Sequence, residues 1–362
     1  MRRPEGQLRS AVRKGSMSVK PDRTAENGRR RFLALAGLGT GVTLATAAAW
    51  QWHRPQRPRS EPDGRYRSLT LAWPAPDTDL VMIVARERGF FANYSLDVTT
   101  KPVTTGNQAI LALGQDSVVG AAAPALSWLP ALYGGKPARL VAGLSAGTYR
   151  LLVRSRSGVA KLENLVGKTI AVADEDAADR RFFSVLLRRK GISPASVQWK
   201  AVQAGQIAEK IASGELDGVV AHDFFAWRLL SESNGGLNEL AGSTTGHYAE
   251  RINRVLGLDD SFLTDDPEGA IALALAFRDA GRWIEKHREE AATLLASHLP
   301  QMGEDIVAAM LAHEPKPLHL IGHWLRDQIA QYADELKLIE LLPDSLNSGE
   351  FAHSVCRNVL HL

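Results

Sequence analysis

Two passages of the chain have the same order of features, and together they decide the fold. Residues 207–223 read IAEKIASGELDGVVAHD, and residues 110–124 read ILALGQDSVVGAAAP. Each has apolar residues at helical spacing, a Gly that ends the helix, an Asp, and a short apolar run that predicts a buried strand. One such unit occurs in any α/β protein. Two of them, each within its own alternation of strands and helices, favour two similar lobes.

The same alternation extends outward from these passages. Apolar runs predict strands at 69–73, 96–100, 117–122, 170–172 and 219–221, and helical spacing predicts helices at 80–91, 108–113 and 125–133. This order indicates an α/β architecture with a mostly parallel sheet flanked by helices in each lobe. Ligands of such sheets bind beyond the carboxyl ends of the strands, so two facing lobes would hold a ligand in the cleft between them.

The N-terminal region carries an export signal. Arg29-Arg30-Arg31-Phe32-Leu33 precedes an uncharged run of small residues, 34–49, which is the pattern of a twin-arginine signal peptide. We therefore expect 1–49 to be cleaved off, the twin-arginine translocase to be a partner during export, and the mature protein to be periplasmic. The alternative is a retained N-terminal membrane anchor, since the apolar segment approaches the length of a membrane span.

The charge of the chain divides at the same point. Residues 1–31 hold ten Lys or Arg against three acidic residues, a net charge of +7, whereas the whole chain is +3 and residues 50–362 are therefore −4. The mildly acidic mature part gives no support to a nucleic-acid partner. Cys356 is the only cysteine, which excludes an internal disulfide and any cysteine-based metal site. We expect no metal, no cofactor and a monomer.

The domain organisation follows from these features. After the signal, residues 50–67 are rich in Pro and Arg and predict an extended linker. The first lobe is expected to comprise residues 68–147 and 248–362, and the second lobe residues 148–247. The crossings between them are predicted at Gly147–Thr148 and at 242–246, where small residues tolerate hinge motion.

Five segments, in this order along the chain, resemble the periplasmic substrate-binding proteins of ABC importers for nitrate, sulfonates and taurine, a family with relatives that bind the pyrimidine precursor of thiamine. They are the opening at 79–98 with Gly89-Phe90-Phe91 and Leu96-Asp97-Val98, KLENLVGKTIAV at 161–172, LLRRKGI at 186–192, GELDG at 214–218, and Pro267-Glu268 with Ala276, Ala280 and Trp283.

The resemblance implies a two-lobed periplasmic-binding-protein fold of type II and a solute-binding function rather than catalysis. The implied partners are a small-molecule ligand and an ABC importer permease with its ATPase. One departure concerns the ligand: Asp174, Glu175 and Asp176 stand where members that bind anions commonly have Gly, Ser or Thr. Asp174 or Asp176 is alternatively a helix cap, where an acidic group is favourable. A ligand with an amine or ring nitrogen beside its anionic group would suit both signs of charge.

The predicted ligand site collects residues that follow the strands or lie at the first crossing. From the first lobe they are Trp73, Pro74, Asp77, Thr78, Ala123 and Pro124, and from the second Tyr149, Asp174, His222 and Asp223. For aromatic residues such as Trp73 and Tyr149, core packing is an equal alternative to lining the pocket.

Two alternatives to a simple binding site remain open in the sequence. An exported enzyme, such as a relative of the thiamine-precursor synthases, could use His222 and Asp223 as acid and base, although this chain lacks the cysteine-rich iron-site segment of the synthase-type members. His319 and His323, four residues apart, could bind zinc on one helix face. With no third ligand evident, surface positions are the simpler interpretation.

Overall fold

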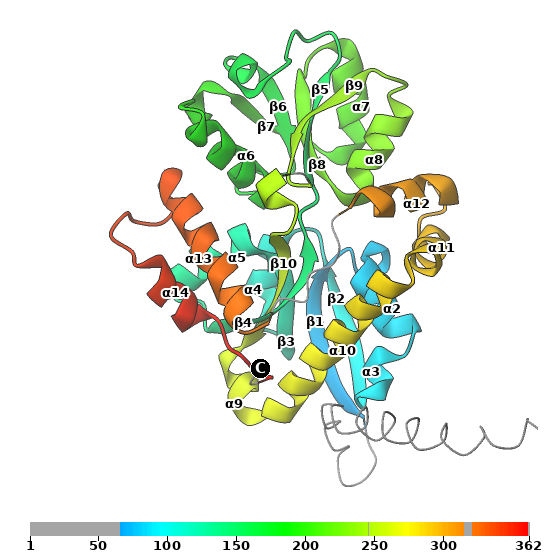
Figure 1. The fold of residues 1–362 in the computed structure, drawn as a ribbon, viewed down its shortest axis with the longest axis vertical. Coiled ribbons are helices and arrows are strands. Elements are labelled where there is room, and N and C mark those ends of the chain that lie inside the picture. Colours follow the sequence, from blue (N-terminus) through cyan, green and yellow to red (C-terminus); the bar gives the residue numbers. More distant parts are fainter. Residues whose placement is uncertain (1–65, 245, 315–320, 361–362) are drawn as a thin grey trace, which may run out of the picture. The chain divides into compact units, whose positions relative to one another are not determined.

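A computed structural model describes residues 66–244, 246–314 and 321–360 (Figure 1). The predicted signal peptide and almost all of the predicted linker lie outside the described residues, as does His319. Within the described part of the chain, none of the helices combines the length and apolar character that a membrane crossing requires.

The first sheet has five strands in the order β2-β1-β3-β10-β4. These are β1 (Arg67–Pro74), β2 (Leu96–Val103), β3 (Val118–Pro124), β4 (Ala138–Ala146) and β10 (Ile252–Asp259). Strand β1 pairs in parallel with β2 and β3, whereas β10 runs antiparallel to both of its neighbours, β3 and β4. One reversed strand therefore lies inside an otherwise parallel sheet.

The second sheet repeats this plan in the order β7-β6-β8-β5-β9. Its strands are β5 (Tyr149–Arg154), β6 (Thr169–Val172), β7 (Gln198–Ala201), β8 (Gly218–His222) and β9 (Leu237–Gly242). Strand β6 is parallel to β7 and β8, and β5 is antiparallel to β8 and β9. In both sheets the reversed strand is the one that enters directly from the other sheet.

Helices pack on the faces of both sheets. The first sheet is accompanied by η1 (Pro76–Thr78), α2 (Leu80–Glu87), α3 (Phe90–Asn93), α4 (Gly106–Ala112), α5 (Ala125–Tyr133), α9 (Asp260–Asp265), α10 (Pro267–Lys286), α11 (Arg288–His298), α12 (Glu304–His313), α13 (His323–Leu338) and α14 (Ser348–Val355). The second has α6 (Ala178–Arg189), α7 (Ala204–Ser213) and α8 (Asp223–Glu232), with the short turns η2 (Leu162–Leu165), η3 (Pro194–Ser196) and η4 (Gly246–Tyr248). Each sheet with its helices is called a lobe below.

Strand alternation assigns the core residues of β1 to two faces. Leu71 and Trp73 belong to the apolar cluster that includes α2 and α10, whereas Ala72 belongs to the cluster that includes α4 and α5. This follows because successive side chains of a strand point to opposite faces of the sheet. Trp73 is fully buried and stacks on Phe277 of α10 at 5.2 Å between ring centroids.

The chain crosses between the sheets twice, after β4 and after β9, and the two crossings lie side by side. The backbone N–H of Tyr149 donates to the hydroxyl of Ser243 at 2.9 Å, and the N–H of Ser243 donates to the carbonyl of Tyr149 at 2.8 Å. A Cβ on Gly147 would lie 2.5 Å from that hydroxyl, so this approach requires glycine. The lobe boundaries at 147/148 and 247/248 stay a prediction.

The α/β fold class predicted from the sequence is confirmed, with two sheets flanked by helices. The predicted strands all fall within or overlap observed strands, and the helix predicted at 125–133 is α5. The segment predicted as helical at 80–91 is two helices, α2 and α3. They are separated at Arg88–Gly89, where Gly89 has a left-handed φ of 71°.

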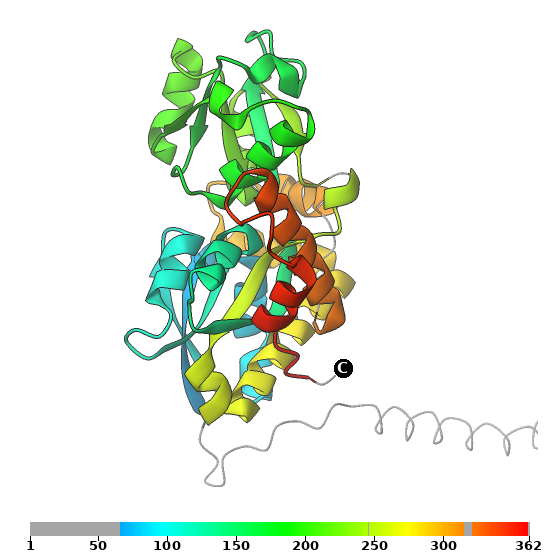
Figure 2. The ribbon, with the colours of Figure 1, turned by 90° about the vertical axis from the view of Figure 1, so that its left-hand side faces the viewer.

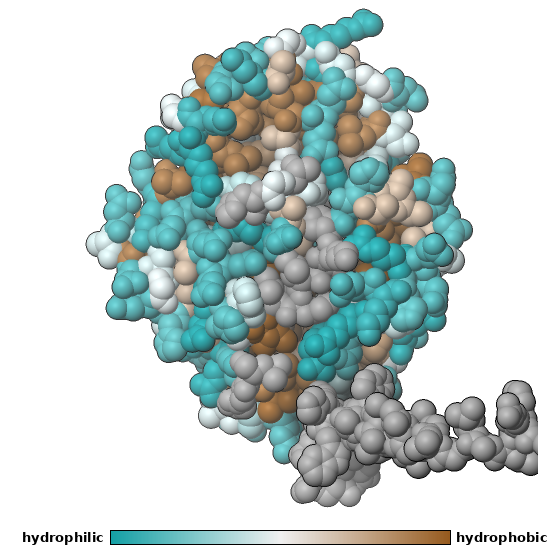
Figure 3. Space-filling view, viewed as in Figure 1, coloured by the Kyte–Doolittle hydropathy of each residue, from teal (hydrophilic) through white to brown (hydrophobic). Residues whose placement is uncertain are grey.

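Figures 2 and 3 show two further features of the fold. In Figure 2, α13 extends along the first lobe toward α6 of the second, and the two helices are in contact. The face drawn in Figure 3 is largely hydrophilic, and many of its brown atoms lie over the second lobe. In the described part of the chain, the large apolar side chains left exposed are spread along the sequence, and only Trp324 and Leu338 share an element, α13: Tyr66, Leu111, Tyr133, Val166, Trp324, Leu338 and Leu341.

Candidate ligand-binding site

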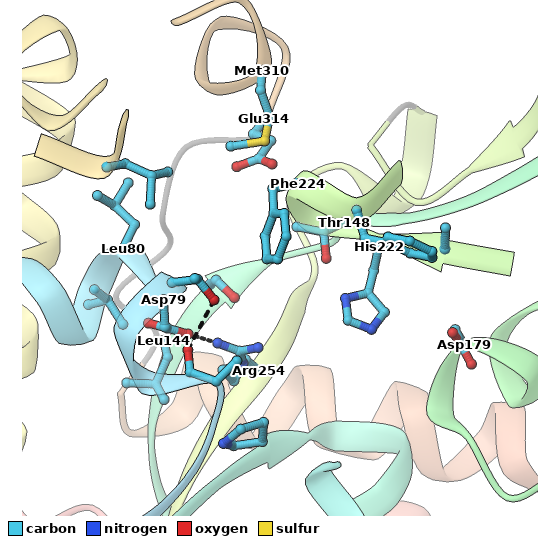
Figure 4. Close-up of a pocket in the computed structure, with 18 of the residues that line it drawn as sticks. Asp79, Leu80, Leu144, Thr148, Asp179, His222, Phe224, Arg254, Met310 and Glu314 are labelled. Atoms are coloured by element: carbon cyan, nitrogen blue, oxygen red, sulfur yellow. Dashed lines mark hydrogen bonds and ion pairs between the residues drawn. The ribbon is translucent and has the colours of Figure 1, made fainter. Parts of the chain in front are cut away.

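A cavity of about 370 Å³ is lined by residues of both lobes (Figure 4). The first lobe contributes the residues that follow β1, the start of α2, the last residues of β4 and the beginning of β10. The second contributes the ends of β6 and β8 and the first turns of α6 and α8. Parallel strands in one sheet bring their carboxyl ends to one edge, which is where open α/β sheets bind ligands.

An ion pair between Asp79 and Arg254 lies on the first-lobe wall of this cavity. Asp79 is also the N-cap of α2, where its Oδ1 accepts the N–H of Met82 at 3.1 Å. This arrangement satisfies one of the N–H groups that a helix start leaves unpaired. Burial lowers the pKa of Arg254 to about 10. The guanidinium stays charged at neutral pH.

The direction of β10 explains why Arg254 reaches the cavity. Arg254 is the third residue of β10, and its register partners are Pro124 and Ser145, near the carboxyl ends of β3 and β4. Because β10 is antiparallel, its beginning lies at the edge where its neighbours end. An arginine early in this strand is thereby placed beside residues that follow the parallel strands.

The second-lobe wall carries His222 and Asp179. His222 is the last residue of β8 and is exposed, whereas Asp179, in the first turn of α6, is only 4 % exposed. Burial raises the pKa of the Asp179 carboxyl, and the charge of Asp174 acts in the same direction, while attraction to His222 opposes the rise. In Figure 4 the imidazole of His222 lies between Arg254 and Asp179.

Hydroxyl groups and apolar side chains complete the lining. The hydroxyls are those of Thr78, Thr104, Ser145 and Thr148. Apolar residues form most of the rest, among them Leu80, Leu144, Val220, Phe224, Phe225, Ile284, Leu295, Met310 and Leu311, with Arg288 and Glu314 as further charged residues. A few polar groups on mostly apolar walls are typical of small-molecule sites. Among the described residues, no three His, Cys, Asp or Glu side chains are grouped so that they could hold a metal ion.

Three of the ten residues predicted for the site line this cavity: Pro74, Thr78 and His222. Pro74 ends β1 and Thr78 ends η1, and both are half-buried. The structure brings them together with His222 because all three follow strands whose carboxyl ends meet here.

The other first-lobe residues of the prediction lie off the cavity lining. Trp73 and Ala123 are fully buried in the core, because their side chains point to the faces of the sheet. Pro124 is half-buried and precedes α5. Asp77 is exposed and forms an ion pair with Arg86 at 3.2 Å.

The remaining second-lobe residues have other surroundings. Tyr149 is buried, with its ring 5.5 Å from that of Phe182 and 6.5 Å from that of His222. The Oδ1 of Asp174 accepts the N–H of Asp176 at 2.7 Å, so this carboxylate caps the turn before α6. Asp223 begins α8, and its side chain lies outside the described part of the structure.

Three charged residues that line the cavity, Arg254, Asp79 and Asp179, were not predicted for the site, although each stands in a recognisable sequence context. Arg254 directly precedes an apolar run, Val255–Leu258, and Asp79 directly precedes the apolar run of α2, as an N-cap does. Asp179 is an acidic residue in the first turn of an amphipathic helix, which is ordinarily a sign of capping alone. Nothing in its own neighbourhood indicates that it is buried and lines a cavity.

Residues 79–291 match the family described as NMT1/THI5 like. The chain belongs to this family. A protein of similar sequence from Brucella abortus (strain 2308) is named a candidate binding protein. It is 23% identical over 221 residues, which are 60% of this chain and 67% of that protein. NMT1/THI5-like membership agrees with the resemblance of the five sequence segments to periplasmic substrate-binding proteins.

Solved structures of periplasmic binding proteins share the fold of this NMT1/THI5-like chain. The periplasmic aliphatic sulphonate binding protein SsuA from Escherichia coli has a TM-score of 0.64 and 16% identity, over 78% of this chain and 90% of that one. The alkanesulfonate-binding protein SsuA from Xanthomonas axonopodis pv. citri, solved with MOPS, gives 0.65 and 18%, over 79% and 98%. The periplasmic nitrate-binding protein NrtA from Synechocystis PCC 6803 gives 0.65 and 13%, over 82% and 87%. These likenesses confirm the two-lobed fold.

Proposed function

We propose that this chain is an extracytoplasmic solute-binding protein. It captures a small molecule with a sulfonate-, nitrate- or taurine-like anionic group and delivers it to an ABC-type importer, a permease with its ATPase. The observation that carries the proposal is the cavity lined by the strand ends of both lobes, with Arg254 on one wall and His222 on the other. The family and the binding proteins that share the fold support it.

The charged groups suggest how such a ligand is held. Arg254 lines the cavity and is the register partner of Ser145 at the end of β4, and the hydroxyls of Ser145 and Thr148 can donate to the same anionic group. Asp79 already offsets the charge of Arg254, so a bare anion gains less there than at an unpaired arginine. An ammonium or protonated ring nitrogen on the ligand can donate a hydrogen bond to Asp179. Of the residues predicted from the sequence, we retain Pro74, Thr78 and His222 in this site.

We propose binding without turnover. The solved structures that share the fold are named as binding proteins. A general acid–base pair formed by His222 and Asp223 would instead convert the bound molecule. Mass spectrometry of the molecule before and after prolonged incubation with the protein separates the two, because a changed mass would show catalysis.

We also propose that the twin-arginine route exports the chain to the periplasm. The support is the segment Arg29–Leu33 with its small-residue run. Exchange of Arg29, Arg30 and Arg31 for lysine should trap a longer precursor in the cytoplasm, and processed protein outside the cytoplasm would contradict this route.

Calorimetry with defined ligands tests the proposed function. The purified chain is first analysed by mass spectrometry for small molecules that it releases, and then titrated with taurine, methanesulfonate and nitrate. Arg254→Gln should weaken binding of an anionic ligand by roughly 2 to 5 kcal/mol, the usual loss when one partner of a buried charge pair is removed. Arg86→Gln, which removes an arginine paired with Asp77 outside the cavity, is the matched control and should bind as the wild type does.

The double variant Asp79→Asn/Arg254→Gln removes both charges, so its folded state carries no uncompensated Asp79. Thermal unfolding of each variant shows whether the fold survives. Unchanged affinity in a folded Arg254→Gln protein would mean that the anionic group lies elsewhere.

A further inference from the structure

One wall of the cavity is built by the C-terminal helices of the first lobe and is apolar. Ile284 of α10, Leu295 of α11 and Met310 of α12 line it together with Leu311. Ile284 and Leu295 are at most 5 % exposed, and both line the cavity. The wall is therefore a built apolar surface within the site.

Two half-buried side chains join this wall to the polar part of the cavity. Leu80 directly follows Asp79 in α2, so the apolar wall begins beside the Asp79–Arg254 ion pair. Phe224, in the first turn of α8, reaches the cavity from the second lobe, and Figure 4 shows its ring between Met310 and Arg254. We call the space bounded by Leu80, Phe224, Ile284, Leu295, Met310 and Leu311 the apolar compartment.

Two charged residues, Arg288 and Glu314, also line the cavity near the compartment. The guanidinium of Arg288 donates to the carbonyl of Leu311 in α12, which holds it near the end of that helix. Glu314 follows Met310 by one helical turn, just beyond the end of α12. Figure 4 shows its carboxylate between Met310 and Phe224.

We propose that this compartment holds a hydrocarbon or aryl body of the ligand, whose anionic end lies at Arg254. This inference rests on the proposed function and narrows its ligand class to amphipathic organic anions. Nitrate has no apolar body, and taurine has only two methylenes, so neither would fill the compartment. A cavity of about 370 Å³ also falls within the size range of sites for organic ligands.

We expect the affinity to depend on the length of the alkyl chain of the ligand. Each methylene moved from water to an apolar wall contributes about 0.8 kcal/mol, which is about a fourfold change in Kd. Affinity should rise by this factor per methylene until the compartment is full and then stop rising.

Titration calorimetry with methane-, propane-, pentane- and heptanesulfonate on the full mature chain tests the inference. The expected result is a Kd that falls about fourfold per methylene across the early members of the series. Equal affinity for all four sulfonates would overturn the apolar compartment and leave the proposed function standing. Absence of binding by every sulfonate would contradict the proposed ligand class itself, and the inference with it.

Variants locate the effect in the structure. Leu80→Ser and Phe224→Ser change half-buried residues of the compartment, and each should reduce the gain per methylene. Leu111→Ser changes a leucine of α4 that is 67 % exposed and outside the cavity lining, and it should keep the full wild-type gain. If both variants are folded and keep the full gain in affinity per methylene, the alkyl group of the sulfonate binds outside the compartment. Unfolding midpoints confirm that each variant is folded before it is titrated.

Discussion

Two aspartates of the candidate site show how neighbours decide the state of a carboxyl group. Asp79 is buried beside Arg254 and an N–H of α2, which favours its charged form. Asp179 is also buried, but no arginine or lysine is paired with it in the described structure, and burial raises its pKa above the usual 3.8. The folded protein therefore holds a proton on Asp179 at a pH at which the unfolded chain has released it.

This difference predicts a pH-dependent effect of Asp179→Asn. Below the unfolded pKa both states are protonated and the substitution should change stability little. As pH rises through the range between the unfolded and the folded pKa, the folded wild type binds more protons than the unfolded chain, so its stability falls. At pH 7 the free energy of unfolding of the variant should therefore exceed that of the wild type. Urea unfolding of the wild type and the variant between pH 3 and 8 measures this difference in stability.

Asp77→Asn is the control for this experiment, because Asp77 is an exposed carboxyl near the same cavity. It should have little effect at any pH. If Asp179→Asn changed stability equally at pH 3 and pH 7, the carboxyl of Asp179 would not be the titrating group.

At the scale of elements, the reversed strand β10 makes a close contact with α5. Trp128 of α5 is fully buried, and its Nε1 donates to the carbonyl of Val255 at 3.1 Å. The indole ring lies over Gly257, where a Cβ would approach Trp128 Cζ2 to 2.4 Å. Only glycine allows the helix and the strand to come so near.

Gly257→Ala should consequently destabilise the protein. Forcing an extra methyl group into a packed core typically costs about 1 to 3 kcal/mol. Gly205→Ala is the matched control: Gly205 lies in α7, a methyl group there would meet no atom within 4 Å, and alanine is the better helix former. Chemical denaturation of both variants is the measurement, and equal midpoints would contradict the packing argument.

The sequence predicted five of the ten strands that the structure describes, β1, β2, β3, β6 and β8, because local periodicity defines them. It could not predict that β10 and β5 run antiparallel, since strand direction is set by where the chain returns from the other lobe. This limit explains the site residues as well. Pro74, Thr78 and His222 obey the rule of strand ends, whereas Arg254 reaches the cavity from the start of a reversed strand. Trp73 lies on a face of its sheet and packs in the core.

At the scale of the whole molecule, Glu335 of α13 ties the second crossing to both lobes. Its carboxylate is almost fully buried and accepts from Arg251 at 2.6 Å, from Arg189 of α6 at 2.8 Å and from the hydroxyl of Tyr248 at 3.1 Å. Burial and the nearby charge of Glu335 raise the pKa of Tyr248 to about 12. Tyr332, also on α13, donates to the carbonyl of Ile252 at 2.6 Å.

Glu335→Gln should therefore lower the free energy of unfolding of the protein, because it leaves the buried guanidinium of Arg251 without its counter-charge. Removal of one partner of a buried ion pair typically costs about 3 to 5 kcal/mol. Glu340→Gln breaks the exposed pair with Arg188 between the same two lobes and should cost about 1 kcal/mol or less. Thermal and urea unfolding compare the two variants. If both variants lost a similar amount of stability, burial would add nothing to the stabilisation by the ion pairs of Glu335.

The position of β10 in the first sheet has a consequence for biosynthesis. All strands of the second sheet precede residue 252, so a nascent chain can complete that sheet while the first still lacks the strand between β3 and β4. Until Ile252–Asp259 is made, two strands expose unpaired edges, which invite pairing with other chains. We expect ribosome-bound or truncated chains that end near residue 250 to fold the second lobe and to aggregate through the first.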